Sequence, residues 1–147
     1  MKISGLKILV IIFSVTMLSC SRQPEPIKYG EDSCNYCGMT IVSQAHSAQA
    51  VSGKGKQFKY DAIECMMNDM VQNPTELAIK HVANYSNPGE MIDAETAGYV
   101  ISDTINSPMG ANLAAVKIVN DNDNLITWEE LKAQFQGNKP LTVNYQE

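Results

Sequence analysis

The chain has 147 residues, which is enough for one ordinary domain or two very small ones with a modest core. Its formal net charge of -5 argues against a nucleic-acid-binding protein and against attachment to anionic lipid through basic residues. With 44% hydrophobic and 18% charged residues, the composition favours a folded globular body over disorder. Four cysteines and eight methionines against two histidines make the chain rich in sulfur ligands and poor in imidazole.

An export signal is predicted for residues 1–19. Two lysines precede an apolar run from Ile8 to Leu18, which is too short to span a bilayer comfortably. The cysteine at position 20 resembles the acylated cysteine of bacterial lipoproteins, with Met17 where leucine is usual. We therefore expect cleavage before Cys20 and acylation of that residue, which would hold the protein stably on a membrane, facing the periplasm. A plain secretory signal is the alternative, and it predicts export as well.

A tether and a hairpin are predicted next. Residues 20–33 contain Pro24 and Pro26 and show no apolar period, so they are expected to hold a domain of residues 34–147 off the membrane. Within that domain, a turn at 53–55 separates the mixed segment 40–51 from a short strand at 57–60, which predicts a hairpin.

A helix is predicted to follow the hairpin. Asp61 and Glu64 form a capping-box-like pair at its start, and Asn73 with Pro74 ends it. Its apolar residues recur on one face, namely Ile63, Met66, Met67, Met70 and Val71. The three methionines are therefore expected in the core.

The rest of the chain repeats this order. Strands are predicted at 77–85, 90–94 and 113–119, with a further apolar segment at 99–101. Thr127 and Glu130 form a second capping box, which opens a helix to about Phe135. The order strand-strand-helix thus occurs twice, which predicts an α+β fold of two small β-β-α units, about 34–85 and 86–147, packed together.

Sulfur ligands are concentrated in two loops. Cys37 and Met39 are two residues apart, so an extended segment places both side chains on one side. Thiolate and thioether are soft donors that favour Cu(I) over harder divalent metals. Met109 lies in a second loop, between Pro108 and Gly110. Cys65 projects away from the apolar face of its helix, towards either the metal loop or solvent.

Cys34 and Cys37 form a C-x-x-C pair that other chemistries could use. A thioredoxin-like redox pair needs a helix directly after the motif, which residues 38–42 do not predict. A zinc site would have to be completed by Cys65 or the two histidines, His46 and His81. A disulfide is allowed in an exported protein, although so small a loop stabilises little, and Cu(I) binding needs Cys37 reduced.

Four motifs in this order resemble the NosL family, accessory lipoproteins of nitrous oxide reductase maturation. They are Cys37–Met39, Phe58–Asp61 leading to Cys65, Met91–Ala94 and Ser107–Gly110. The resemblance spans roughly residues 34–119. It implies a Cu(I) chaperone rather than an enzyme, with a fold related to the core of organomercurial lyases.

The same resemblance implies a ligand set. Cys37 and Met109 would bind Cu(I), with Met39 as the third choice. Cys34 adds a thiol that many relatives lack, so a site of two cysteines and one methionine is also open. Transfer by ligand exchange would require ligands on accessible loops.

Three hypotheses remain for the function. The first is delivery of Cu(I) to nitrous oxide reductase or its assembly machinery. The second is a thiol-based enzyme, organomercurial-lyase-like or thiol–disulfide, that uses Cys37, Cys65 and Asp61 and therefore needs the two thiols close together. The third is a zinc-binding or purely structural lipoprotein.

Overall fold

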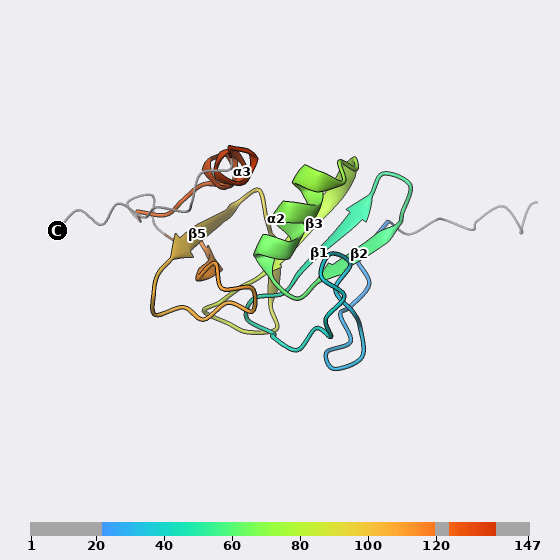
Figure 1. Ribbon diagram of the computed structural model, residues 1–147, viewed down its shortest axis with the longest axis horizontal. Helices are drawn as coiled ribbons and strands as arrows, with labels where there is room; N and C mark the ends of the chain where they lie inside the picture. Colours follow the sequence, from blue (N-terminus) through green and yellow to red (C-terminus); the bar gives the residue numbers. More distant parts are fainter. Residues whose placement is uncertain (1–21, 120–123, 138–147) are drawn as a thin grey trace, which may run out of the picture.

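The computed structural model describes residues 22–119 and 124–137, so the predicted leader and Cys20 lie outside the described residues (Figure 1). The elements in chain order are β1 (Ala48–Ser52), β2 (Gln57–Tyr60), α2 (Ile63–Gln72), β3 (Leu77–Ala83), β4 (Met91–Asp93), β5 (Ala97–Ile101), β6 (Leu113–Lys117) and α3 (Trp128–Gln136). Two antiparallel sheets and two helices confirm the predicted α+β class. Within these ranges, no helix is long and apolar enough to cross a membrane.

The larger sheet has the order β2-β1-β3-β4, and every neighbouring pair in it is antiparallel. β1 is buried along its whole length, because it is central and α2 packs over this part of the sheet. The predicted hairpin is the pair β1–β2. β4 pairs with β3, for example through Val82 and Ile92. The larger sheet therefore includes residues on both sides of residue 85, near which the sequence predicted the boundary between two β-β-α units.

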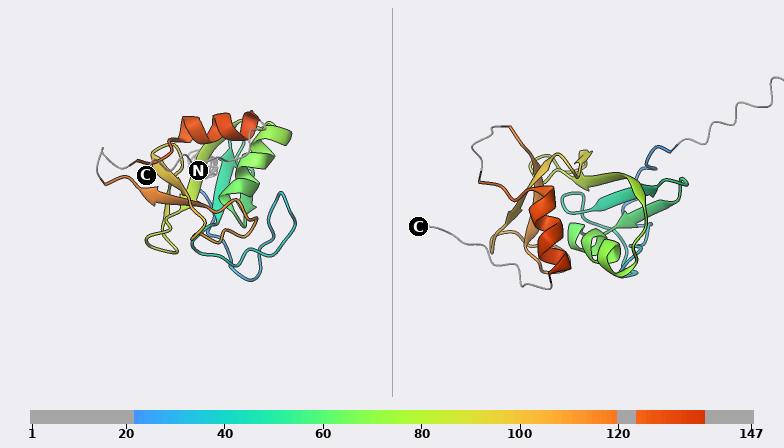
Figure 2. Two further views of the ribbon diagram at one scale, coloured as in Figure 1. Left: turned by 60° about the vertical axis from the view of Figure 1, so that its left-hand side comes forward. Right: turned by 90° about the horizontal axis from the view of Figure 1, so that it is seen from above.

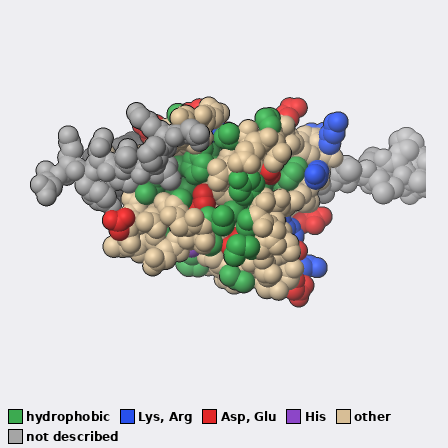
Figure 3. Space-filling model, in the orientation of Figure 1, with side chains coloured by type: hydrophobic (Ala, Val, Ile, Leu, Met, Phe, Trp, Pro, Cys, Tyr) green, Lys and Arg blue, Asp and Glu red, His purple; other side chains and the backbone are tan. Residues whose placement is uncertain are grey.

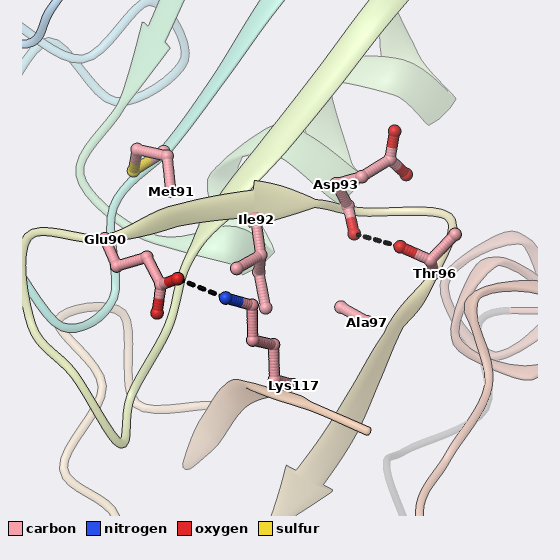
Figure 4. Close-up of a pocket in the computed structure, with 7 residues that line it drawn as sticks. All are labelled: Glu90, Met91, Ile92, Asp93, Thr96, Ala97 and Lys117. Carbon is pink, nitrogen blue, oxygen red and sulfur yellow. Dashed lines mark hydrogen bonds and ion pairs between the residues drawn. The ribbon is translucent and has the colours of Figure 1, made fainter. Parts of the chain in front are cut away.

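The smaller sheet is the hairpin of β5 and β6, in which Tyr99 lies opposite Ala115. It joins the larger sheet where the amide of Tyr85 donates to the carbonyl of Ala115, at 2.8 Å. Figure 4 shows a second connection, an ion pair between Glu90 before β4 and Lys117 of β6, beside a cavity of about 210 Å³. The two sheets therefore form one body around a continuous hydrophobic core.

The start of α2 differs from the prediction. Ala62 is the N-cap, with extended backbone and no side-chain cap. The side chain of Asp61 instead accepts a hydrogen bond from the amide of Val42, at 3.2 Å. Glu64 instead accepts one from the hydroxyl of Ser107, at 2.5 Å. The predicted capping box is wrong because both of its carboxylates bind partners distant in the sequence.

The start of α3 confirms the prediction. The amide of Glu130 donates to the hydroxyl of Thr127, and the amide of Thr127 donates to the carboxylate of Glu130. α3 lies beside α2 and covers β5 (Figure 2). Its buried residues Trp128 and Leu131 enter the common core. Met66 and Met67 of α2 are buried and Met70 is partly buried in the same core, as predicted.

The described part of the predicted tether lies against the edge strand β2. The amide of Glu25 donates to the side-chain oxygen of Gln57, and the side-chain nitrogen of Gln57 donates to the carbonyl of Gln23, both at 3.1 Å. Lys59 donates to the carbonyl of Pro26, at 3.1 Å. The carbonyls of Gln23 and Pro26 thus accept from side chains of the edge strand β2, so this segment is fixed to the sheet.

Candidate metal centre

Residues 33–40 form a closed loop that carries two of the cysteines. Ser33 and Thr40 form an antiparallel bridge, and the amide of Cys34 donates to the carbonyl of Met39, at 2.8 Å. The amide of Gly38 donates back to the carbonyl of Cys34, at 3.0 Å. Gly38 has a φ of +74°, a conformation that favours glycine, so the residue between Cys37 and Met39 closes the loop.

Hydrogen bonds fasten this loop to the end of β2. The amide of Asn35 donates to the carbonyl of Lys59, at 2.8 Å, and the amide of Lys59 donates to the side-chain oxygen of Asn35, at 2.6 Å. The Lys59 ammonium also pairs with Asp32, at 2.7 Å. Because β2 runs directly into α2, these bonds place the loop beside the first turn of that helix.

Three cysteines meet at this junction. The sulfurs of Cys34, Cys37 and Cys65 all lie within 4.8 Å of one another. Cys34 and Cys65 are buried, whereas Cys37 is partly exposed. All three are free thiols. Of the two directions that the sequence left open for Cys65, the structure shows the one towards the loop.

The environment favours one negative charge on this cluster. A hydrogen bond from Cys65 lowers the pKa of Cys34 to about 4, and the backbone amides of Cys37, Asp61 and Tyr36 act in the same direction. The pKa of Cys65 is raised, because its proton is held by the Cys34 sulfur and because it is buried. Burial raises the pKa of the Cys37 thiol. The position at the N-terminus of α2 also favours a thiolate.

The two candidate methionines lie at the surface. The side chain of Met39 is 54% exposed and that of Met109 is 43% exposed. Met109 occupies a tight turn in which the amide of Gly110 donates to the carbonyl of Ser107, at 3.0 Å, and Gly110 has a φ of +77°. The sequence thus placed both thioethers in accessible loops correctly, and the structure gathers the three thiols.

The hydrogen bond between Ser107 and Glu64 connects the Met109 turn to the cysteine cluster. Both side chains are buried, and Glu64 directly precedes Cys65 in the first turn of α2. The second carboxylate oxygen of Glu64 has no hydrogen-bond partner among the described residues. Sequence reasoning missed this connection because Glu64 fits a helix cap equally well, and no local signal links it to a serine 43 residues away.

The other candidate residues have different roles. His46 is a core residue: its Nδ1 lies 3.2 Å from the carbonyl oxygen of Leu113, and its ring lies 5.3 Å from that of Tyr85. His81 lies on β3, and Asp61 is buried with its carboxylate bound to the Val42 amide. In the described ranges, neither a histidine nor a carboxylate joins the three sulfurs. The arrangement can hold a soft metal ion through sulfur alone.

Comparison with known proteins gives a consistent picture. The crystal structure of the copper chaperone NosL from Shewanella denitrificans superposes with a TM-score of 0.62 and 16% sequence identity, over 74% of this chain and 95% of that one. No curated protein matches the chain. The model of the NosL family matches residues 27–128, well over half of the chain, and includes all three clustered cysteines. The chain therefore belongs to the NosL family.

Proposed function

We propose that this protein is a lipid-anchored Cu(I) chaperone of the periplasm, and that it delivers copper to nitrous oxide reductase or the machinery that assembles it. The observation that carries the proposal is the group of three sulfurs within 4.8 Å, one of them partly exposed. Family membership and the fold shared with the Shewanella denitrificans copper chaperone support it.

The spacing of the sulfurs suits a single ion. Three sulfurs around one metal, each about 2.3 Å from it, lie about 4 Å from one another in a plane. The observed group needs only a small contraction to reach this arrangement. The buried pair Cys34 and Cys65 would retain the ion, and Cys37 would offer it to an acceptor. Binding would also release thiol protons, because the ion requires thiolates.

The exposed thioethers suit the steps of loading and transfer. A thioether is a neutral soft donor, so it can bind Cu(I) without retaining it as strongly as a thiolate does. Met39 belongs to the cysteine loop, and the turn of Met109 is fastened to the first turn of α2. We propose that both accompany the ion between the thiols and the partner protein.

Two alternatives are less well supported. A closed zinc site needs a fourth protein ligand, and the described histidines and carboxylates provide none beside the sulfurs. The lyase hypothesis required Cys37 close to Cys65, which is the case, together with Asp61 as the proton donor. The buried carboxylate of Asp61 accepts from the Val42 amide, and among the described residues it is not part of the group of ligand atoms within 4.8 Å of one another, so nothing beside the thiols marks it as their proton donor.

An anaerobic titration of the reduced protein with Cu(I), in competition with a coloured chelator, tests the copper site. We expect one tightly held Cu(I) per chain and a large loss of affinity in Cys37→Ser. As a control, Met91→Leu removes the partly buried sulfur of β4, which is not part of the cysteine cluster, and should leave the Cu(I) affinity unchanged. Failure of the reduced wild type to take up Cu(I), or full affinity in Cys37→Ser, would overturn the proposed site.

Two further measurements test the finer parts of the proposal. Intact-mass analysis of the membrane-extracted protein should show a chain that begins at an acylated Cys20. Mixing the copper-loaded protein with copper-free nitrous oxide reductase should transfer the metal faster than free Cu(I)–chelator complex does. Equal rates would argue for a different recipient, while leaving the copper site itself intact.

A further inference from the structure

A basic hollow lies at the tip of the β1–β2 hairpin, at the opposite end of β2 from the thiols. Its volume is about 670 Å³, and it is lined by Arg22, by the hairpin turn with Lys54 and Lys56, and by the loop after α2 with Glu76. Figure 3 shows that the Lys and Arg side chains visible on this face gather mostly at its right-hand end, with acidic side chains among them.

The charge of this hollow differs in sign from that of the whole chain. Three cationic side chains and one carboxylate line it, a balance of +2 (three minus one), whereas the formal charge of the protein is -5. The ion pairs found in the described residues use other lysines, so Arg22, Lys54 and Lys56 are not neutralised by such a pair. The low total charge therefore does not exclude a local contact with anionic lipid.

The lysines are held in an ordered turn. Ser52 binds both backbone groups of Lys56: its amide donates to the Lys56 carbonyl at 2.9 Å, and its hydroxyl accepts from the Lys56 amide at 3.0 Å. The amide of Gly53 donates to the carbonyl of Glu76, at 3.2 Å, which fixes the turn to the neighbouring loop. Lys54 and Lys56 are exposed. The backbone of both lysines is therefore held in place, and the Lys56 ammonium lies 4.7 Å from the centre of the Phe58 ring.

We propose that this end of the molecule faces the membrane, and that Arg22, Lys54 and Lys56 contact the phosphate groups of anionic phospholipids. The inference rests on the proposed acylation of Cys20. Arg22 follows that residue by two positions, so an extended chain keeps it within about 7 Å of the anchor. Basic residues this close to a lipid surface are strongly attracted to its negative potential. The three cations belong to separate positions in the chain and are spread over the hollow. A membrane surface offers several phosphate groups to such a set, whereas a small anion offers only one.

This orientation would set the position of the copper site. β2 spans Gln57–Tyr60 between the basic turn and the thiols, and a strand rises about 3.3 Å per residue. The cluster would then stand more than about 10 Å from the lipid surface, with the partly exposed Cys37 available to a partner protein.

Chemical labelling of lysine side chains tests the orientation. The full, lipidated chain is first inserted into lipid vesicles. The vesicles contain phosphatidylcholine alone, or phosphatidylcholine with phosphatidylglycerol. We expect severalfold slower modification of Lys54 and Lys56 in the anionic vesicles, an effect that added salt removes. Lys117 and Lys132, on β6 and α3, provide the control and should react equally in both. Equal reactivity of Lys54 and Lys56 in both vesicles would overturn the proposal.

Further measurements show whether the protection comes from lipid phosphates or from a free anion. In Lys54→Gln, the protection of Lys56 should fall by about fivefold, whereas Lys132→Gln should leave it unchanged. Protection by inorganic phosphate in phosphatidylcholine vesicles at equal ionic strength would indicate a free-anion site and overturn the membrane contact. Intact mass and Cu(I) uptake of the same samples report on the anchor and the copper site. A protein that is acylated and binds copper, but shows no protection, contradicts the orientation alone.

Discussion

The cysteine loop and the Met109 turn present sulfur in opposite ways. Backbone hydrogen bonds close the cysteine loop and fasten it to β2, and two of the three gathered sulfurs are buried. The Met109 turn lies at the surface, and a single described side-chain bond, from Ser107 to Glu64, connects it to the cluster. The difference suggests a division of labour, in which a rigid group of thiols holds the ion and a lightly fastened thioether exchanges it.

The largest expected effect is loss of a buried thiol. Cys65→Ser should lower Cu(I) affinity by more than about 100-fold, the upper range for residues that merely support metal ligands. The variant should still fold, because serine is nearly isosteric with cysteine and α2 is formed by its apolar face. Chelator competition gives the affinity, and circular dichroism checks the fold. A loss as small as that of Met109→Ala would break the proposed division.

Met109→Ala should act mainly on exchange. We expect its Cu(I) affinity to fall less than that of Cys65→Ser, while metal transfer to an acceptor chelator, followed by stopped flow, becomes clearly slower. Val119→Ala, which shortens an even more exposed apolar side chain, should leave both quantities unchanged. An unaltered transfer rate in Met109→Ala would remove the thioether from the mechanism.

Ser107→Ala tests the connection between the two regions. It would leave the buried Glu64 carboxylate without its described donor, and an unsatisfied buried polar group costs about 1–3 kcal/mol of unfolding free energy. Urea unfolding measures that loss, with Ser86→Ala, at an exposed serine, as the control. If the turn positions Met109, copper transfer should also slow in Ser107→Ala. A stability loss with unchanged transfer would make the bond purely structural.

Thr127→Ala should separate stability from copper binding. It removes the side-chain cap of α3, at a cost of about 1 kcal/mol. α3 packs on α2 and β5 but contributes none of the three clustered thiols, so Cu(I) affinity should not change. Urea unfolding measures the free energy of unfolding, and chelator competition on the same sample measures the Cu(I) affinity. A parallel fall in affinity would show that the two halves are more tightly coupled than their contacts indicate.

The smallest effect is expected in acid. Hydrogen bonds from Lys117 and Asn84 lower the pKa of Glu90 to about 2, below its ordinary value near 4.5. The interaction therefore stabilises the fold fully above pH 4.5 and is lost as the pH falls towards 2. Since Glu90 is partly exposed to solvent, screening by water keeps the contribution small. Glu90→Gln should slightly flatten the decline of unfolding free energy over this range, and an identical decline would contradict the assignment.

The sequence predicted best where local chemistry decides the structure. The capping box of Thr127 and Glu130 needs only residues three apart, and α3 begins there as predicted. Asp61 and Glu64 have the same spacing, but they bind Val42 and Ser107, which no local pattern reveals. For Cys65 the helical period gave two possible directions, and only the docking of the cysteine loop on β2 decides between them.

The N-terminal segment also makes contacts that local sequence patterns do not reveal. Its prolines and lack of apolar period favoured a tether, and they gave no sign that its described part binds Gln57 and Lys59. Those contacts depend on β2 being an edge strand, which is a property of the sheet order. The core methionines of α2 could be predicted from the helical period, and the exposure of Met39 and Met109 agrees with their place in turn-rich loops.

Lys59 has a mechanical consequence. Its ammonium binds the carbonyl of Pro26 and the carboxylate of Asp32, and its backbone binds Asn35, beside Cys34. One residue of a sheet strand therefore clamps both the N-terminal segment and the loop that carries the thiols. A sideways pull on the N-terminal segment would be taken up by the sheet before it distorted the loop. Under the proposed anchoring at Cys20, movement of the anchor would leave the shape of the cysteine loop unchanged.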